Sequence, residues 1–449
     1  EEMFEVPQWA ANKVVYQIFP SRFAATQPVD KKLWYKAPIT PMDDLHGNLR
    51  GIIEHLDYIK DLGIDVVYLT PIFKSNSCHK YDTIDYYQVD PSFGTTEDLK
   101  ELVQKSHERG MKVVLDAVYN HSGREFFAFQ DILEKGEKSK YLDWYFIDEL
   151  PPKSEWGEIP NFKCFGYYGG MPKLNLKNPE VEKYITDVAC YWIKECDIDG
   201  WRLDVGDEIS HFFWKNFRKA IKAVKKDMLI IGEIWHYAGD FLEGDEWDTV
   251  MNYPFYLNLI DLLADEKINV SQFVQNLGYL KGRLNKKCYP LMWNLIDSHD
   301  TARFLHLCND NKKKQHLAAA FQLLLPGMPM VYYGDEYAMP GANDPDCRRG
   351  MYWDEEYQDK EMFEWYKRLL QVRKAHTCIV EGELTEAITR DEDETIVLIR
   401  KNGEETIALI FNCSDHTKEF KEYAQKQDLL TEKAFDGKVE AFDAAVIVL

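Results

Sequence analysis

Short hydrophobic runs alternate along most of the chain with segments in which hydrophobic residues recur every three or four positions. The runs are continuously apolar, which is typical of strands in a parallel sheet covered on both faces. The recurring pattern predicts amphipathic helices. Alternation of this kind favours a closed (β/α)8 barrel over an open, doubly wound sheet. The predicted strands lie within residues 14–19, 64–70, 112–118, 200–205, 228–234, 248–254, 291–297 and 329–336.

Local signals for helix ends agree with this alternation. Gly63 follows a helical pattern at the position of a C′ glycine, and Thr95 or Thr96 can cap the next helix. Asn178 followed by Pro179 is typical of an N-cap and a first-turn proline. These signals place the expected helices between the expected strands.

Two segments break the alternation and divide the chain. Residues 119–176 are rich in Trp, Tyr, Pro and Gly and too long for an ordinary connection, which predicts an inserted subdomain after the third strand. Near the end of the chain, Asn402-Gly403 separates two strand-like runs and predicts a hairpin with a type I′ turn. The expected domains are a barrel (1–118 and 177–380), the subdomain (119–176) and a C-terminal antiparallel β-sandwich (381–449).

Composition and charge exclude several classes of partner. The 449-residue chain carries 54 basic and 76 acidic residues, a formal net charge of -22, so nucleic acid and anionic membrane surfaces are not expected partners. No run reaches the ~18 apolar residues of a membrane span. The nine cysteines are scattered without a C-x-x-C pair, which predicts a reduced, cytoplasmic chain rather than a disulfide framework or zinc site.

Polar residues gather at the ends of the expected strands. Arg202 and Asp204 stand two residues apart and therefore point to the same face of one strand. Burying such charges costs several kcal/mol unless they are paired. The carboxyl ends of barrel strands open onto the active site of this fold, so we expect these charges to face a pocket. The other polar residues at strand ends are Asp116, Asn120, His121, Glu233, His299 and Asp300.

Carboxylates at three strand ends indicate acid–base chemistry. We expect Arg202 to lower the pKa of Asp204 and to hold it ionised. The apolar neighbours of Glu233 are expected to raise its pKa and keep a proton available. An ionised and a protonated carboxyl group about 5–5.5 Å apart form the arrangement that cleaves a glycosidic bond with retention.

Five short motifs carry a family resemblance. "DAVYNH" (116–121), "GWRLDV" (200–205), "GEIW" (232–235) and "NLIDSHD" (294–300) resemble, in order, the four signatures of the α-amylase family of glycoside hydrolases. "MPKLN" (171–175) resembles the fifth signature in the form found in cyclomaltodextrinases, neopullulanases and maltogenic amylases. The resemblance extends from about Trp9 to the C-terminus.

The resemblance implies a retaining double displacement on α-1,4 and α-1,6 glucosidic bonds in maltooligosaccharides, cyclodextrins, pullulan or starch. It implies that Asp204 is the nucleophile, that Glu233 is the acid and base, and that Asp300 is the third carboxylate, which binds and distorts the sugar. It also implies an orienting role for Arg202 beside Asp204. The sugar-binding residues that it implies are Tyr81, His121, Arg202, Trp235, His299, Asp344 and Arg348.

The chain departs from the family pattern at the usual calcium site. That site uses a His four residues after the nucleophile, where this chain has Glu208, and an Asp where it has Asn175. Asn120 remains, but one ligand does not make a site. We therefore expect no metal and no other cofactor. Most relatives of the subgroup carry an N-terminal β domain that helps to form a dimer; because this sequence starts at the barrel, the oligomeric state stays open.

Simpler interpretations stay open for several residues. Arg202 and Asp204 could be a structural ion pair, and Asp116 is interpreted as a brace for Arg202 rather than a catalytic group. Trp156, Tyr167 and Tyr168 are interpreted as core of the inserted subdomain. A transglycosylase, in which a sugar hydroxyl replaces water, is an alternative function, as is a non-catalytic glucan-binding scaffold, although the three carboxylates argue against the latter.

Overall fold

Parallel strands form the central sheet of the protein, in the order β10-β1-β2-β5-β6-β7-β8-β9. The computed structural model describes residues 4–449, so residues 1–3 of the expected barrel segment lie outside the described residues. Each of the eight predicted runs contains one of these strands. The strands are β1 (Val15–Ile18), β2 (Val66–Leu69), β5 (Lys112–Ala117), β6 (Gly200–Leu203), β7 (Leu229–Gly232), β8 (Thr249–Asn252), β9 (Trp293–Asn294) and β10 (Met330–Tyr332).

The sheet curves until its two edges meet. Strand β10 pairs with β1, and every pairing between neighbours is parallel. At the remaining gap, the Asn294 amide donates to the Met328 carbonyl at 3.2 Å, and the Met328 amide donates to the Met292 carbonyl at 2.7 Å. These bonds join the end of β9 to the residues before β10, so the predicted (β/α)8 barrel is confirmed.

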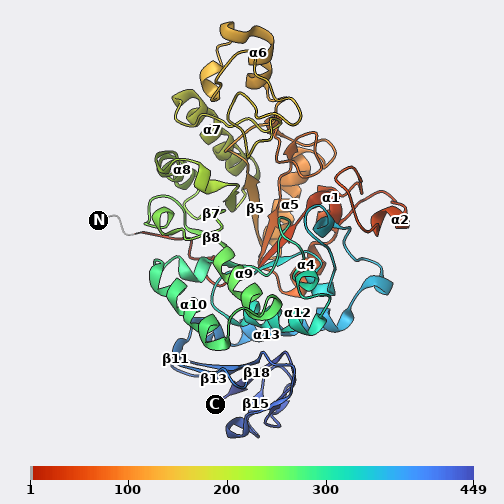
Figure 1. Ribbon diagram of the computed structural model, residues 1–449, viewed down its shortest axis with the longest axis vertical. Coiled ribbons are helices and arrows are strands. Elements are labelled where there is room, and N and C mark those ends of the chain that lie inside the picture. Colours follow the sequence, from red (N-terminus) through yellow and green to blue (C-terminus); the bar gives the residue numbers. More distant parts are fainter. Residues whose placement is uncertain (1–3) are drawn as a thin grey trace.

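Helices surround the barrel and begin and end where the sequence signals lie (Figure 1). Gly63 ends α4 with a φ of 117°, Thr95 caps α5 through the Asp98 amide, and Asn178 caps α7 ahead of Pro179. The helices of the barrel are α3 (Leu49–Glu54), α4 (Leu56–Leu62), α5 (Thr96–Glu108), α7 (Pro179–Cys196), α8 (His211–Val224), α9 (Tyr253–Leu259), α10 (Val270–Arg283), α11 (Phe304–Leu307), α12 (Lys312–Leu324) and α13 (Lys360–Ala375).

Alternate residues of each strand face the helices or the barrel interior. On β2, Val67 and Leu69 belong to the large core cluster under the helices, whereas Val66 and Tyr68 belong to the interior cluster. On β6, Trp201 packs in the outer cluster. The alternation therefore turns Arg202 into the barrel interior.

The segment between β5 and β6 is mostly irregular and extends from one end of the barrel, at the top of Figure 1. It contains α6 (Phe127–Lys135) and isolated β-bridges, among them His121 with Lys173 and Cys164 with Pro172. Short elements also precede it: α1 (Pro20–Phe23), α2 (Lys31–Trp34), β3 (Phe73–Lys74) and β4 (Asp85–Val89).

An antiparallel sheet follows the barrel at the opposite end, at the bottom of Figure 1, which confirms the predicted C-terminal β fold. Its order is β11-β12-β13-β18-β15-β16, and β14 pairs separately with β17. The bounds are α14 (Cys378–Glu381), which precedes the sheet, β11 (Glu383–Arg390), β12 (Thr395–Lys401), β13 (Thr406–Asn412), β14 (Lys418–Glu419), β15 (Gln427–Asp428), β16 (Lys433–Ala434), β17 (Lys438–Val439) and β18 (Asp443–Val448).

The predicted hairpin between β12 and β13 exists, but the predicted type I′ turn is wrong. Lys401 pairs with Thr406, so the loop has four residues, 402–405. The Asn402 side chain accepts hydrogen bonds from the Glu404 and Glu405 amides, at 3.0 and 2.8 Å. Neither Asn402 nor Gly403 has a positive φ. The side chain of Asn402 thus closes the turn in place of a left-handed backbone.

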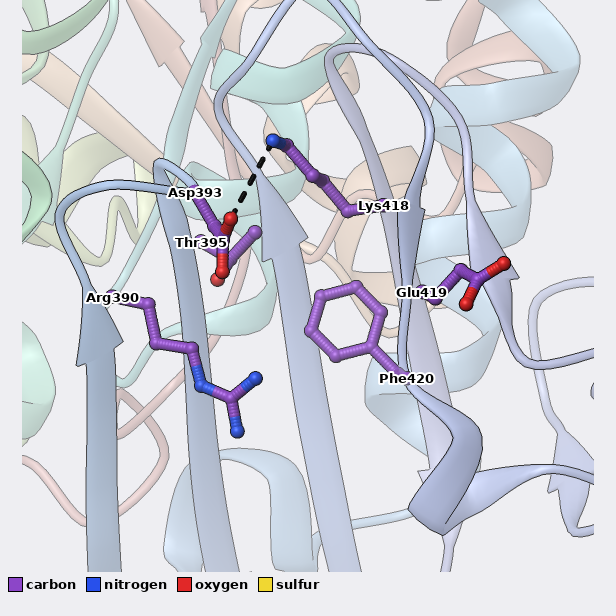
Figure 2. Close-up of a pocket in the computed structure, with 6 residues that line it drawn as sticks. All are labelled: Arg390, Asp393, Thr395, Lys418, Glu419 and Phe420. Atoms are coloured by element: carbon purple, nitrogen blue, oxygen red, sulfur yellow. Dashed lines mark ion pairs between the residues drawn. The ribbon is translucent and has the colours of Figure 1, made fainter.

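A small pocket of about 230 Å³ lies in this C-terminal sheet (Figure 2). Lys418 and Asp393 form an ion pair of 3.7 Å across it, beside Arg390 and Phe420. Because the sheet and the inserted segment lie at opposite ends of the molecule, this pocket is remote from the insert. Within residues 4–449, the nine cysteines are unpaired, and no helix combines the length and apolarity needed to cross a membrane.

Candidate active site

The backbone places the polar residues at the carboxyl ends of neighbouring strands. Asp116 on β5 pairs in register with Arg202 on β6. Beyond the strands, the Asp204 amide donates to the Ala117 carbonyl and the Glu233 amide donates to the Leu203 carbonyl, each at 3.0 Å. The ladder therefore continues to both carboxylates, which are held by the rigid barrel rather than by a free loop.

One guanidinium contacts three carboxylates inside this end of the barrel. Arg202 is fully buried, and its Nη1 donates to both Asp116 oxygens at 3.1 Å and to Asp204 Oδ1 at 3.0 Å. Its Nη2 lies 2.8 Å from Glu233 Oε2. Asp204 and Glu233 are themselves only 8% and 6% exposed. A single cation, with little access to bulk water, is therefore shared among the three carboxylates at this end of β6.

Sharing one cation changes the expected acidities. Burial and the neighbouring Glu233 carboxylate raise the pKa of Asp204 well above its usual range, although Arg202 opposes them. Arg202 acts to lower the pKa of Asp204, as predicted, but the expectation that it keeps the pKa low is wrong, because burial and the Glu233 carboxylate outweigh it. Burial raises the pKa of Glu233, as predicted, and raises that of Asp116 to about 6. The cluster as a whole retains protons more strongly than isolated carboxyl groups would.

The backbone after Asp204 is strained and contacts Glu233. Val205 has a φ of 45°, a left-handed conformation that costs a β-branched residue of order 1–3 kcal/mol. Its amide donates to Glu233 Oε1 at 2.8 Å. The Trp247 ring packs so close to Gly232 that a Cβ there would lie 2.2 Å from a ring atom. Strain and close packing together place the Glu233 carboxylate beside the β6 end.

A chain of hydrogen bonds connects Tyr81 and His299 to this network. Tyr81 Oη donates to Asp116 Oδ2 at 2.9 Å and lies 2.7 Å from His299 Nε2. His299 Nδ1 lies 2.7 Å from the Gln17 amide nitrogen. The donors are consistent when Gln17 donates to Nδ1 and Nε2–H donates to Tyr81. Burial lowers the pKa of His299 well below its usual value, so the imidazole is neutral.

His121 is brought to the same end of the barrel. Its Nε2 lies 2.9 Å from the Tyr81 carbonyl, and burial lowers its pKa to about 4. The neutral ring therefore donates its Nε2 proton to a backbone oxygen. The Phe165 ring of the inserted segment lies 5.3 Å from the His121 ring, so the insert contributes to the wall of the site.

The remaining predicted residues contact one another or neighbouring side chains. Arg348 pairs with Asp344 at 2.9 Å, approaches Asp300 Oδ1 at 3.6 Å and donates from Nε to the His299 carbonyl at 2.9 Å. Trp235 follows Glu233 closely in the chain and stacks on Tyr253, with ring centroids 3.6 Å apart. Trp235 is 41% exposed, which leaves an aromatic surface near Glu233.

Three aromatic residues of the insert differ from the sequence interpretation. The sequence predicts Trp156, Tyr167 and Tyr168 in a subdomain core, but they are 102%, 80% and 59% exposed. Tyr167 and Tyr168 lie in the tight turn that follows Phe165, where the Tyr168 amide donates to the Phe165 carbonyl at 3.1 Å. The insert therefore carries exposed rings on the same turn as the residue that contacts His121.

Several contributors to the site did not emerge from the sequence. Gln17 and Tyr68 both occupy interior-facing positions of their strands, and Tyr68 Oη donates to Asp116 Oδ2 at 2.6 Å. Both are polar residues at a position of the strand that faces the barrel interior, and this pattern can be read from the sequence. The Val205 amide and the Tyr253 ring under Trp235 left no signal, since backbone direction and ring stacking depend on the folded structure.

Comparison with known proteins agrees with this geometry. Residues 17–358 match the model of the alpha amylase catalytic domain. The chain belongs to the α-amylase family. It is therefore a glycoside hydrolase, and the family resemblance predicted from the five motifs is confirmed.

Several relatives and solved structures are similar to this chain over most of its length. A cyclomaltodextrinase of Geobacillus thermopakistaniensis is 46% identical over 422 residues, which cover 93% of this chain and 71% of the relative. Neopullulanase 2 of Thermoactinomyces vulgaris is 42% identical, with 92% and 71% covered. The structure of a cyclic alpha-maltosyl-(1→6)-maltose hydrolase from Arthrobacter globiformis is similar, with a TM-score of 0.90, 35% identity and coverage of 99% and 100%.

Proposed function

We propose that the protein is a retaining α-glucan hydrolase that acts through a covalent glucosyl-enzyme. The observation that carries this proposal is the placement of Asp204 and Glu233 against the two terminal nitrogens of one buried guanidinium. Adjacent placement suits the separation of about 5–5.5 Å in retaining enzymes better than the wider gap of inverting enzymes, which holds a water molecule between the carboxyl groups.

In the first step, Asp204 Oδ attacks the anomeric carbon and forms the glycosyl ester while the glycosidic bond breaks. Glu233 transfers its proton to the departing oxygen. Arg202 makes a charge-assisted hydrogen bond to Asp204, which stabilises the ionised nucleophile. The raised pKa of Glu233 supports its role as the proton donor. Its Oε2 must leave Arg202 Nη2 to reach the leaving oxygen.

In the second step, Glu233 removes a proton from water, and the water oxygen forms a bond to the anomeric carbon. The ester bond to Asp204 breaks, and the carboxylate is regenerated. The Val205 amide keeps Glu233 Oε1 in place through both steps. Asp300, held near Arg348, is assigned to the hydroxyl groups of the bound sugar, together with the neutral His121 and His299.

The proposed substrate class rests on the names of the relatives and on the exposed Trp235 ring near Glu233. Relatives are named cyclomaltodextrinase, maltogenic alpha-amylase and neopullulanase, and we propose that this chain cleaves α-1,4 glucosidic bonds, with α-1,6 bonds as a further candidate. We assign maltooligosaccharides, cyclodextrins, pullulan or starch to this chain on the same basis. Its unpaired cysteines and a relative named intracellular maltogenic amylase support a cytoplasmic location.

The decisive experiment is a product profile on maltotriose, β-cyclodextrin, pullulan and soluble starch, with the anomeric configuration read by proton NMR at early times. We expect shorter reducing sugars released as the α-anomer. Release of the β-anomer would contradict the retaining mechanism. Accumulation of products longer than the substrate would identify a transglycosylase, and no reaction on any of the four would reject the proposed substrates.

A further inference from the structure

Three segments of the active-site end meet at one lysine side chain. Asn120 follows β5, Lys173 belongs to the inserted segment, and Glu208 ends the short 3-10 helix η3 (Gly206–Glu208) behind Asp204. Lys173 Nζ donates to Asn120 Oδ1, and it donates to the Glu208 carbonyl at 3.0 Å. The backbone supports this arrangement, since Lys173 bridges with His121 and the Leu174 amide donates to the Asn120 carbonyl at 3.0 Å.

The two oxygens that Lys173 binds belong to the place where the family pattern expects calcium. A calcium ion needs six to eight oxygen ligands. Here Asn120 Oδ1 and the Glu208 carbonyl already accept from an ammonium group, which would be repelled by a metal ion. Asn175 is turned elsewhere, since its amide donates to the Asp143 carbonyl at 3.0 Å and its Oδ1 accepts from the Lys177 amide.

Other observations agree that these residues do not fit calcium. In residues 4–449, no cluster of three or more His, Cys, Asp and Glu side chains is arranged to hold a metal ion. The Glu208 carboxylate approaches the Asn120 amide at 3.4 Å, so the acidic group remains beside the ammonium.

The contacts of η3 lead from Lys173 to the reacting groups. The Glu208 amide donates to the Val205 carbonyl at 3.0 Å, and the Val205 amide donates to Glu233 Oε1 at 2.8 Å. We propose that Lys173 is a positioning residue whose ammonium group takes the place of a bound divalent cation between the barrel and the insert. Through η3 it fixes the strained Val205 peptide and, with it, the Glu233 carboxylate.

The first test compares Lys173→Met with Lys163→Met. Lys163 pairs with Lys173 along the backbone and is exposed, and its ammonium group lies over the Phe146 ring, so it is a matched control. We expect Lys173→Met to lower kcat about 10²-fold, the size of effect that a misplacement of about 1 Å produces, with a smaller change in KM. The pH profile of kcat/KM should also shift, because Glu233 loses its fixed partner. The control should retain wild-type values.

Rescue separates the ammonium group from a general loss of packing. Added methylammonium should raise kcat of Lys173→Ala at least threefold over the same variant without amine. Tetramethylammonium, which has no N–H donor, should leave it unchanged. Wild-type activity and Tm should be unchanged by a chelator or by added Ca²⁺. If Lys173→Met does not fold, Lys173→Arg keeps the charge with a different geometry and should show a three- to tenfold loss with the same shift of the pH profile.

Two results would overturn the inference. One is a wild-type enzyme that loses activity or Tm with a chelator and regains it with Ca²⁺. The other is a folded Lys173 variant with wild-type kcat and pH profile. The activity assays rest on the proposed function, but the Tm response to the chelator does not. A wild type without α-glucan hydrolysis would therefore reject the proposed function and leave the metal test intact.

Discussion

A buried carboxylate lies at each end of strand β6, and the surroundings shift the two pKa values in opposite directions. Asp199, just before β6, is 1% exposed and lies 2.7 Å from His107 Nε2, 3.0 Å from Lys225 Nζ and 2.8 Å from the Val113 amide. Burial acts to raise the pKa of Asp199, but these partners together lower it. Asp199 therefore has three donors of its own, although Lys225 also pairs with the exposed Asp197.

Asp204, just after β6, has fewer donors than carboxylates around it. One Arg202 side chain faces Asp116, Asp204 and Glu233, and the pKa values of all three are raised. A carboxylate with several donors stabilises the folded protein. A group of carboxylates with too few donors destabilises it and has shifted pKa values of the kind found at reactive sites. The difference shows that burial alone does not distinguish a structural acid from a functional one. The number of donors per carboxylate does.

The largest effect is expected from Asp204→Asn. Loss of the nucleophile should lower kcat by at least about 10³-fold on maltotriose, because no covalent intermediate can form. Steady-state kinetics on freshly purified protein would measure this loss. Asp199→Asn is the control from the same strand and should retain kcat within about twofold. Comparable losses in the two variants would remove the functional distinction between the two ends.

Glu233→Gln is expected to have the next largest effect. Removal of a general acid costs about 10²–10⁴-fold when the leaving group needs a proton. We therefore expect a loss in that range on maltotriose and a much smaller one on α-maltosyl fluoride, whose leaving group needs no protonation. The ratio of the two losses is the measurement. Equal losses on both substrates would assign Glu233 a role other than proton donor.

The fold and the position of the site could be predicted because both depend on short-range patterns. Continuous apolar runs located the strands, and the carboxyl ends of adjacent parallel strands lie at one edge, which brings Asp204, Glu233 and His299 together. The pKa of Asp204 could not be predicted, since it depends on burial in the folded barrel and on the Glu233 carboxylate of the next strand. A single strand shows only the Arg202–Asp204 pair.

Irregular segments account for the other differences. The insert has little periodicity, so its rings were assigned to a core, yet Trp156 and Tyr167 are exposed. The contacts of Lys173 with Asn120 and Glu208 depend on how the insert returns to the barrel, which no local pattern records. At the β12–β13 turn, the Asn402 side chain competes with the backbone conformation that Asn-Gly favours.

A moderate effect on stability is expected from Asp199→Asn. The substitution removes the buried anionic partner of Lys225 and His107 and leaves them only the exposed Asp197, so we expect a loss of about 1–3 kcal/mol in the free energy of unfolding. Urea denaturation at pH 7 would measure it. Because the pKa of Asp199 is lowered in the folded state, its contribution is present above the unfolded pKa of about 3.9 and is lost as the pH falls through the folded value. The difference between wild type and variant should therefore shrink in acid.

The smallest effect is expected on the stability of Asp204→Asn, which should change with pH in the opposite direction to that of Asp199→Asn. The folded pKa of Asp204 is raised, so its contribution to stability is present below the unfolded pKa and is lost as the pH rises through the folded value. Removing the charge should therefore raise the free energy of unfolding by about 1 kcal/mol at pH 8, and this gain should diminish toward pH 4. Thermal unfolding of both variants across this range tests the comparison directly. A loss of stability in Asp204→Asn at pH 8 would mean that Arg202 stabilises Asp204 as the donors at the other end stabilise Asp199, and the two ends of β6 would no longer differ in kind.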